Sequence, residues 1–109
     1  MEELTLAYFY TLHVGLSSND PLFSVAGNRT RLLAILDKRH SHGYSLVEGT
    51  GCFAGIKEPC ILATVIYVGE GLGEQAAFDY IQDTARRIKN DLAQEEVWIT
   101  RRIEGLRVV

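Results

Sequence analysis

The sequence predicts one α+β domain, spanning residues 1–109, whose elements follow the order βαββαβ. Two observations lead to this prediction. Apolar residues alternate at period two over Thr5–Leu16, which is typical of a strand, and recur every three or four positions over Glu74–Gln94, which is typical of a helix. A length of 109 residues suits a single domain with a modest core.

The first part of the chain is expected to hold a strand, a turn and a helix. One face of the strand Thr5–Leu16 carries its large apolar side chains, which are Leu6, Tyr8, Tyr10, Leu12, Val14 and Leu16. The polar cluster Ser17–Asp20, which a proline follows, predicts a turn. The helix is expected over Asn28–Lys38, with Asn28 as its N-cap and Gly43 as its terminator.

The middle of the chain is expected to hold two strands separated by a loop. Tyr44–Val47 begins the first of them. Three glycines then fall within Glu48–Gly55, which indicates a flexible or close-approach loop and not a plain hairpin. The nearly continuous apolar run Pro59–Val68 predicts the next strand, and both of its faces are apolar.

The last part of the chain is expected to hold a turn, a helix and a strand. Gly69–Gly73 reads as the turn. The helix Glu74–Gln94 has an apolar stripe, which consists of Phe78, Ile81, Ala85, Ile88 and Leu92. Val97–Thr100 is the expected fourth strand, and the tail Ile103–Val109 is a candidate short edge strand.

This order of elements indicates a ferredoxin-like fold, a four-stranded antiparallel sheet with both helices on one face. The other face of such a sheet is open. Because the strands at Thr5–Leu16 and Pro59–Val68 are apolar on both faces, the open face would expose an apolar surface. We therefore expect it to be buried against copies of the same chain, in a closed cyclic trimer or dimer.

Composition narrows the function classes. The chain is 47% hydrophobic and 23% charged, which indicates a globular protein, and its net charge of −3 argues against nucleic-acid binding. No secretory signal is expected, since glutamates follow Met1, and no apolar run approaches the roughly 20 residues of a membrane span. Cys52 and Cys60 are expected to be free thiols, and the cytoplasm is the expected compartment.

The segment from Tyr44 to Glu58 is the best candidate for a site. Its glycines allow the backbone to approach a ligand, and Phe53 and Glu58 add an aromatic ring and a carboxylate. Glu58 precedes Pro59, which fixes the local chain direction, so its carboxylate could bind a ligand cation or act as a general base. The alternative is that Glu58 simply faces water at the sheet edge.

Other candidate groups have ordinary structural explanations. Tyr44 fits a half-buried strand aromatic with a solvated hydroxyl, and His13 fits a satisfied polar residue. His40 and His42 flank a helix end and have no third ligand at a zinc spacing, so no metal is expected. Phosphate-binding glycine motifs are absent, and no serine has a base and an acid at motif spacing.

Several short segments, in a shared order, resemble the phage S-adenosylmethionine (SAM) lyases, long described as SAM hydrolases. The resemblance begins in the first strand and continues through the region around Glu58 into the last helix and strand. The segments are Phe9-Tyr10-Thr11-Leu12, Ser18-Asn19, Tyr44, Val47-Glu48, Thr50-Gly51-Cys52 with Phe53, Glu58, Ala85-Arg86, Asn90, Gln94 and Val97.

The resemblance implies a PII-like homotrimer with ligand sites between subunits. It also implies cleavage of SAM into methylthioadenosine and homoserine lactone, through attack of the substrate's own carboxylate, without a cofactor or metal. Phages use this reaction to deplete the methyl donor and so blunt host restriction. On this basis Glu58 is expected to hold the substrate ammonium and Tyr44 to assist catalysis. The expected substrate-binding residues are Phe53, Gly51, Thr50, Ser18 and Asn19.

The chain departs from that family at Phe53, where the family often has tyrosine, and Tyr44 is the candidate to supply the hydroxyl. The loop between Phe53 and Glu58 is also shorter. Two other functions stay open from the sequence. One is a PII-like module that binds a nucleotide or metabolite without chemistry, and the other is a phage protein that blocks a host factor.

Overall fold

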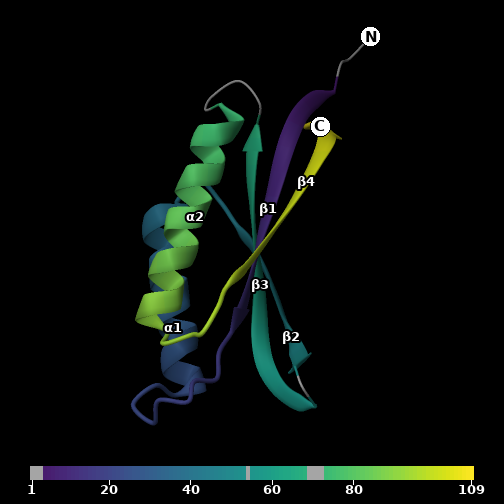
Figure 1. Ribbon diagram of the computed structural model, residues 1–109. Helices are drawn as coiled ribbons and strands as arrows, with labels where there is room; N and C mark the ends of the chain where they lie inside the picture. Colours follow the sequence, from purple (N-terminus) through teal and green to yellow (C-terminus); the bar gives the residue numbers. More distant parts are fainter. Residues whose placement is uncertain (1–3, 54, 69–72) are drawn as a thin grey trace.

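In the computed structural model, a four-stranded antiparallel sheet is covered on one face by two helices (Figure 1). The structure describes residues 4–53, 55–68 and 73–109. Its elements are β1 Thr5–Gly15, α1 Val25–Arg39, β2 Ser45–Phe53, β3 Ile56–Val68, α2 Glu74–Asp91 and β4 Trp98–Leu106. Neither of these helices is long and apolar enough to cross a membrane.

The strand order is β2-β3-β1-β4, with β1 and β3 in the centre. Strand β1 pairs antiparallel with β3, where Tyr10 faces Val65, and with β4, where Leu12 faces Ile99. Strand β2 pairs antiparallel with β3, so β2 and β3 form a hairpin. The ferredoxin-like βαββαβ fold predicted from the sequence is confirmed, since α1 and α2 lie on the same face of this sheet (Figure 1).

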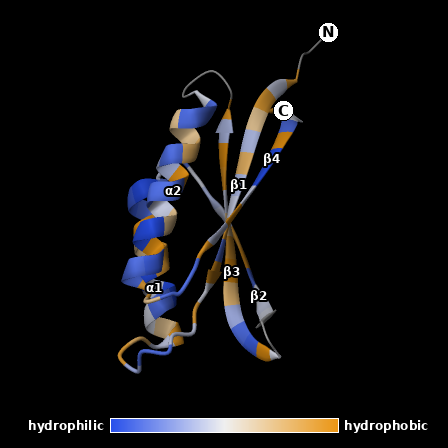
Figure 2. Cartoon of the chain, viewed as in Figure 1, coloured by the Kyte–Doolittle hydropathy of each residue, from blue (hydrophilic) through white to orange (hydrophobic). Residues whose placement is uncertain are grey.

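The core lies between the sheet and the two helices. Alternate residues of β1 point toward the helices, and Tyr10, Leu12 and Val14 are fully buried there. Ile61, Ala63 and Val65 of β3 extend this layer. The helices close it with one apolar stripe each, which holds Leu32, Ile35 and Leu36 of α1 and Ala77, Ile81, Ala85 and Ile88 of α2. Hydrophobic residues dominate β1 and β3, whereas the helices carry many hydrophilic ones (Figure 2).

The opposite face of the sheet has no helix over it and is apolar, as the sequence predicts. Phe9 of β1 and Leu62 of β3 lie on this face and are half-buried. Around them, Ile66 is 46% exposed, Trp98 56% and Val47 62%. Val47, Leu62, His13 and Trp98 form a cross-strand row over all four strands. We call this surface the open face.

Helix α1 begins earlier than predicted, because a different residue caps it. The Ser24 hydroxyl accepts a 2.9 Å hydrogen bond from the Gly27 N–H, as an N-cap does, and the helix starts at Val25. Asn28, the predicted cap, is fully buried within the helix. Its Nδ2 donates to the carbonyl oxygens of Leu16 at 2.9 Å and Leu92 at 3.1 Å. Asn28 therefore joins α1 to the ends of β1 and α2.

The glycine-containing segment is a strand, not the predicted loop. Strand β2 runs from Ser45 to Phe53, and its residues pair with β3 from Thr64 to Ile56. Strand β4 is likewise continuous over Trp98–Leu106, where the sequence predicts a short strand and a separate tail strand. Helix α2 ends at Asp91, before the predicted Gln94. The predicted turn Gly69–Gly73 falls largely on residues 69–72, which lie outside the described residues.

A buried polar cluster joins the end of α1 to the middle of α2. His40 is 3% exposed, and its Nε2 lies 2.9 Å from the Thr84 hydroxyl oxygen. Thr84 donates its hydrogen to the Tyr80 carbonyl at 3.1 Å and accepts from Arg39 Nε at 2.9 Å. His40 must therefore donate from Nε2. Burial, helped by the charges of Arg39 and His42, lowers the pKa of His40 to about 4.

This cluster predicts that acid destabilises the protein through His40. An unfolded histidine takes up a proton near pH 6.5, whereas folded His40 resists protonation until about pH 4. The stabilisation, on the order of 3 kcal/mol, is full above pH 6.5 and is lost as pH falls toward 4. We expect urea unfolding at pH 7 to 4.5 to show this loss in the wild type. A His40→Gln variant should lose less stability over the same interval, and parallel curves would contradict the prediction.

Candidate active site beside Gly15

The carboxylate of Glu58 lies against the backbone of Gly15. Glu58 is on β3, two residues before Cys60, which pairs with Gly15 at the end of β1. Side chains two apart on a strand share a face, so Glu58 and Gly15 both belong to the open face. A Cβ placed on Gly15 would be 2.6 Å from Glu58 Oε1, so any side chain at this position would force the carboxylate to move. The absence of a side chain at Gly15 therefore makes room for the carboxylate.

The side chain of Gln94 reaches the same point from the segment after α2. Its Oε1 is 3.1 Å from the position of that Cβ. Its Nε2 donates to the carbonyl oxygens of Ser17 at 2.8 Å and Leu92 at 3.2 Å. Because both amide hydrogens are used in this way, the amide oxygen is the atom turned toward Gly15. Glu58 and Gln94 thus present two oxygens to one small region.

These two oxygens form an acceptor pair that lacks a donor. Within the described part of the chain, no side chain donates a hydrogen bond to Glu58 Oε1 or Gln94 Oε1. Two hydrogen-bond acceptors, one of them charged, match a primary ammonium group, which has three N–H donors and a positive charge. Among the described residues there is no cluster of three His, Cys, Asp or Glu that could hold a metal.

The loop after β1 is tied to the Gln94 segment by two side chains. Ser18 Oγ donates to the Ala93 carbonyl at 3.0 Å and accepts from the Asp20 N–H at 3.1 Å. Asn19 Nδ2 lies 3.4 Å from Glu95 Oε1. The structure therefore brings the predicted binding residues Ser18 and Asn19 close to Gln94. It commits the hydroxyl hydrogen of Ser18 to the backbone.

The predicted residues of β2 divide between the two faces of the sheet. Gly51 pairs with Glu58 and shares the open face with it. Thr50 has the opposite orientation, like its neighbour Glu48, whose carboxylate binds Arg29 of α1 at 2.8 Å. The Phe53 backbone pairs with Ile56 at the end of the hairpin. The side chains of Phe53 and Cys52 lie outside the described part of the structure, whereas Cys60 is a free thiol, as expected.

Tyr44 lies on the helix side of the sheet, away from Glu58. Its ring packs against the core, and its hydroxyl donates to Asp37 of α1. That hydrogen bond, with some burial, raises the pKa of the Tyr44 hydroxyl. Ser45, the next residue, pairs with Thr64, whereas Glu58 pairs with Gly51 near the other end of β2. Within a single chain, Tyr44 and Glu58 are therefore not in the same site.

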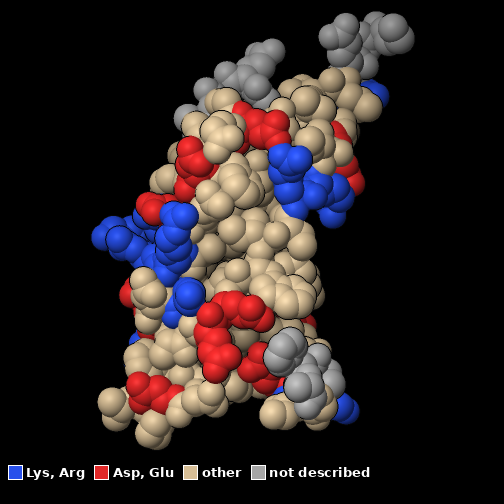
Figure 3. All heavy atoms as spheres, in the orientation of Figure 1, with Lys and Arg blue, Asp and Glu red and all other residues tan. Residues whose placement is uncertain are grey.

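The surface near this site is acidic. In Figure 3, acidic side chains gather in the lower part of the view, the end at which β1 enters the loop before α1 (Figure 1). The sequence adds Glu95 and Glu96 directly after Gln94. Basic side chains gather over α2 and toward the far end of β4, where acidic side chains also lie beside them (Figure 3). A cationic ligand would therefore be attracted to the Gly15 end of the molecule.

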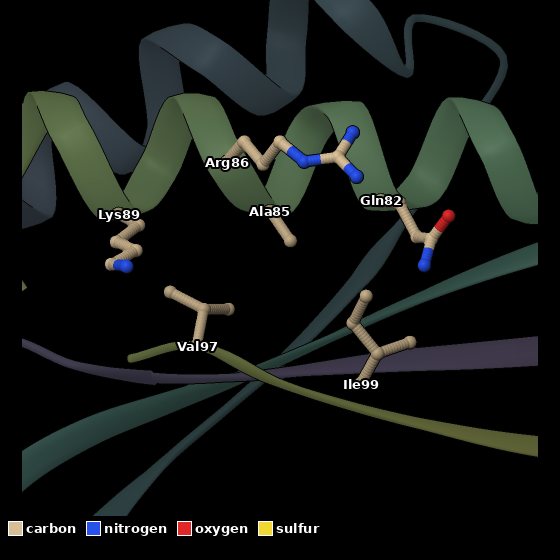
Figure 4. A pocket seen from close by; sticks show the side chains of 6 residues that line it. All are labelled: Gln82, Ala85, Arg86, Lys89, Val97 and Ile99. Atoms are coloured by element: carbon tan, nitrogen blue, oxygen red, sulfur yellow. The ribbon is translucent and has the colours of Figure 1, made fainter. Parts of the chain in front are cut away.

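A separate pocket of about 180 Å³ lies between α2 and β4. Ala85 of α2 faces Val97 and Ile99 on the opposite wall, and Gln82, Arg86 and Lys89 also extend from α2 (Figure 4). None of the residues predicted to bind substrate lines it. The pocket is too small for a nucleoside-sized ligand, since small-molecule sites usually exceed roughly 300 Å³.

Gly15 and Gln94 were not predicted as site residues from local sequence features. Gly15 ends a strand, which offers no sign of chemistry. Gln94 occurs only in the family resemblance, as one of its matching residues. Their contact with Glu58 depends on the pairing of β1 with β3 and on the chain direction after α2, and neither can be read from nearby residues.

The contact with Gly15 predicts a selective effect of the Gly15→Ala substitution. The atoms that the new Cβ would meet are the ends of the flexible Glu58 and Gln94 side chains, so these can move aside. We expect the free energy of unfolding to change by less than about 1 kcal/mol, while the two oxygens separate. The NMR signals of the Gln94 side-chain amide should shift.

Gly73→Ala is the matched control, because a Cβ at Gly73 meets no atom within 4 Å. It should leave the Gln94 signals unchanged. Unshifted Gln94 signals in Gly15→Ala would contradict the geometry described above.

Comparison with known proteins identifies the fold. No protein-family model and no curated protein sequence matches the chain. Two solved structures of a phage SAM lyase do match its structure, each with a TM-score of 0.71 over 97% of this chain and 88% of the other. One is the apo state, at 24% sequence identity, and the other is a complex with S-methyl-5′-thioadenosine, at 23%. The chain therefore has the fold of the phage SAM lyases, as the sequence resemblance implies.

Proposed function

We propose that this protein is a SAM lyase that cleaves SAM into methylthioadenosine and homoserine lactone. The observation that carries the proposal is the acceptor pair of Glu58 and Gln94 beside Gly15, which suits the ammonium of an amino-acid ligand. The fold adds support, because a phage SAM lyase of the same fold was solved in complex with S-methyl-5′-thioadenosine.

The proposed reaction is internal to the substrate. One carboxylate oxygen of SAM attacks its γ-carbon, and a carbon–oxygen bond forms as the bond from that carbon to the sulfonium sulfur breaks. The electron pair of the broken bond stays on sulfur, which becomes the neutral thioether of methylthioadenosine. The positive charge of the ammonium remains on the lactone. Atoms and charge balance without water, a proton transfer, a metal or a cofactor.

In this proposal the protein acts mainly by holding a bent substrate. Glu58 and Gln94 bind the ammonium, which fixes the carbon next to the attacking carboxylate. Holding two reacting groups of one molecule in the attack geometry can supply several kcal/mol of the barrier reduction. Because no proton moves in the bond-making step, Glu58 serves as a charged anchor and not as a general base.

The other expected binding residues fit a site that two chains share. Gly51, Ser18 and Asn19 are on the Glu58 side, whereas Tyr44 and Thr50 are on the helix side. If Tyr44 assists catalysis, a neighbouring copy must supply it. Phe53 is proposed to support the sulfonium by cation–π attraction, worth about 0.5–2 kcal/mol.

Assembly and biological role follow from the same proposal. The open face exposes Val47, Trp98 and Ile66, so we propose that it is covered by sister subunits in a PII-like homotrimer. A phage would use the enzyme in the host cytoplasm against restriction, with SAM as the partner molecule. The proposed reaction involves neither nucleic acid nor a membrane.

A second function is a PII-like module that binds a nucleotide or related metabolite without chemistry. The observation that favours it is the engagement of the Tyr44 hydroxyl by Asp37. If the reaction needs a hydroxyl that Phe53 lacks, and Tyr44 keeps this bond in the assembly, the site would bind but not cleave.

The central test is incubation of the purified protein with SAM, with the products followed by chromatography and mass spectrometry. We expect methylthioadenosine and homoserine lactone from the wild type. Glu58→Gln should lower turnover at least a hundredfold, because a neutral amide holds the ammonium poorly. Glu48→Gln, on the opposite face, is the matched control and should keep activity. Homoserine as the first product would refute the lactone mechanism, and an active Glu58→Gln variant would remove Glu58 from it.

The open face also predicts the number of copies. Analytical ultracentrifugation at micromolar concentration should give the mass of three chains, because a monomer would leave the open face in water. Substituting Trp98 or Ile66 with Glu should dissociate the assembly, whereas the same change at the helix-exposed Gln75 should not. A wild-type monomer would exclude both the trimer and a shared site.

A further inference from the structure

The turn that follows α2 contains a residue in an unfavourable backbone conformation. Among the described residues, Ala93 alone has both a side chain and a positive φ, of +51°. A left-handed conformation is unfavourable for alanine relative to ordinary helical geometry, because it brings the Cβ too close to the following carbonyl oxygen. Such a residue persists only where its surroundings hold it. Ala93 lies between Leu92, the C-cap of α2, and Gln94 of the candidate site.

Backbone hydrogen bonds at this turn have the pattern of a Schellman motif. The Gln94 N–H donates to the Lys89 carbonyl at 2.9 Å, which is the bond that characterises this motif. The Ala93 N–H makes a longer, 3.3 Å bond to the Asn90 carbonyl. Glycine usually occupies the left-handed position of such a turn, because it has no Cβ. Here alanine occupies it, so the conformation must be stabilised from outside the helix.

Two side chains from distant segments provide that stabilisation. Ser18, in the loop after β1, donates to the Ala93 carbonyl at 3.0 Å. Asn28, fully buried in α1, donates to the Leu92 carbonyl at 3.1 Å and to the Leu16 carbonyl at 2.9 Å. Both sides of Ala93 are therefore tied to the end of β1, the strand that contains Gly15.

The direction of Gln94 depends on this turn. Had residue 93 kept helical geometry, α2 would continue, and its next side chains would follow the helix. The left-handed step instead ends the helix and turns the chain back toward β1. Gln94 can then place its amide hydrogens on the Ser17 and Leu92 carbonyls and its oxygen beside Glu58.

We propose that Ala93 is a positioning residue, whose left-handed turn, anchored by Ser18 and the buried Asn28, aims Gln94 at the ammonium site. The expected effect on SAM kinetics rests on the proposed function. The role of Ala93 in placing the Gln94 side chain does not depend on it. Ala93 itself need not touch the substrate. It acts by fixing the second acceptor, so it should affect how tightly the ammonium is held more than the bond-breaking step.

The test compares two substitutions at Ala93. Valine is β-branched and strongly disfavours positive φ, whereas glycine adopts it freely. In Ala93→Val, we expect hydrogen exchange of the Gln94 side-chain amide, measured by NMR, to accelerate about tenfold, because a β-branched residue tolerates positive φ far less well than alanine does. KM for SAM should rise by a similar factor with kcat changed less. Ala93→Gly, the conservative variant, should stay within about threefold of the wild type in both measurements.

A third variant keeps the test decisive if Ala93→Val fails to fold. Ser18→Ala removes the bond to the Ala93 carbonyl and should also accelerate exchange of the Gln94 amide, with circular dichroism unchanged. Unchanged exchange in Ser18→Ala, or in an Ala93→Val variant that folds, would overturn the proposal. So would an Ala93→Gly variant as defective as Ala93→Val, since the methyl group and not the turn would then matter. If the wild type does not cleave SAM, the proposed function fails, while the exchange rates still decide whether Ala93 positions Gln94.

Discussion

The pairing register of β1 with β3 is the constraint on which both the core and the site depend. It sets Tyr10 opposite Val65 on the helix side and Gly15 opposite Cys60 on the open face. Side chains alternate between faces along a strand, so a slip of one residue would exchange the faces. The buried Tyr10 would then move into water, and Glu58 would lose its place beside Gly15. Hydrophobic burial along the centre of β1 therefore also fixes the geometry at its end, where the chemistry is proposed.

The local pattern of residues predicted β1 and α2, because burial on one side imposes a clear period on each of them, and it predicted β3 as a nearly continuous apolar run. It failed at β2, since glycine marks loops more often than strands. In the structure, a Cβ at Gly49 or Gly51 would meet Cys60 Sγ at 3.9 or 3.8 Å, which is ordinary contact. These glycines therefore belong to a normal hairpin and are not forced by close approach. The start of α1 was misplaced for a related reason, because Asn28 has the chemistry of a cap but is used in a buried tertiary contact.

The candidate site was predictable only in part. Glu58 could be predicted as a site residue, because its carboxylate lies directly before Pro59 and an apolar strand. Gln94 could not be selected on chemistry, because an amide after a helix is common on protein surfaces. Its role depends on hydrogen bonds to Ser17 and Leu92, which come from the ends of two different elements. The tertiary fold brings these carbonyl oxygens together, so local sequence patterns do not predict the contact.

The combination of one carboxylate and one amide has an electrostatic advantage over two carboxylates. Two carboxylates this close would repel each other, and the pKa of one of them would rise, so that part of the population would be protonated at neutral pH. A protonated carboxyl group loses its charge and part of its acceptor capacity. Glu58 with Gln94 avoids this competition, because the amide adds an acceptor without adding charge. A bound ammonium then contacts one full negative charge, which balances its own charge, and a second acceptor oxygen. Without a ligand, the two oxygens do not carry two repelling charges. In a reaction that exchanges no proton with the protein, a carboxylate that stays charged and binds the ammonium is more useful than an acid or base with a shifted pKa.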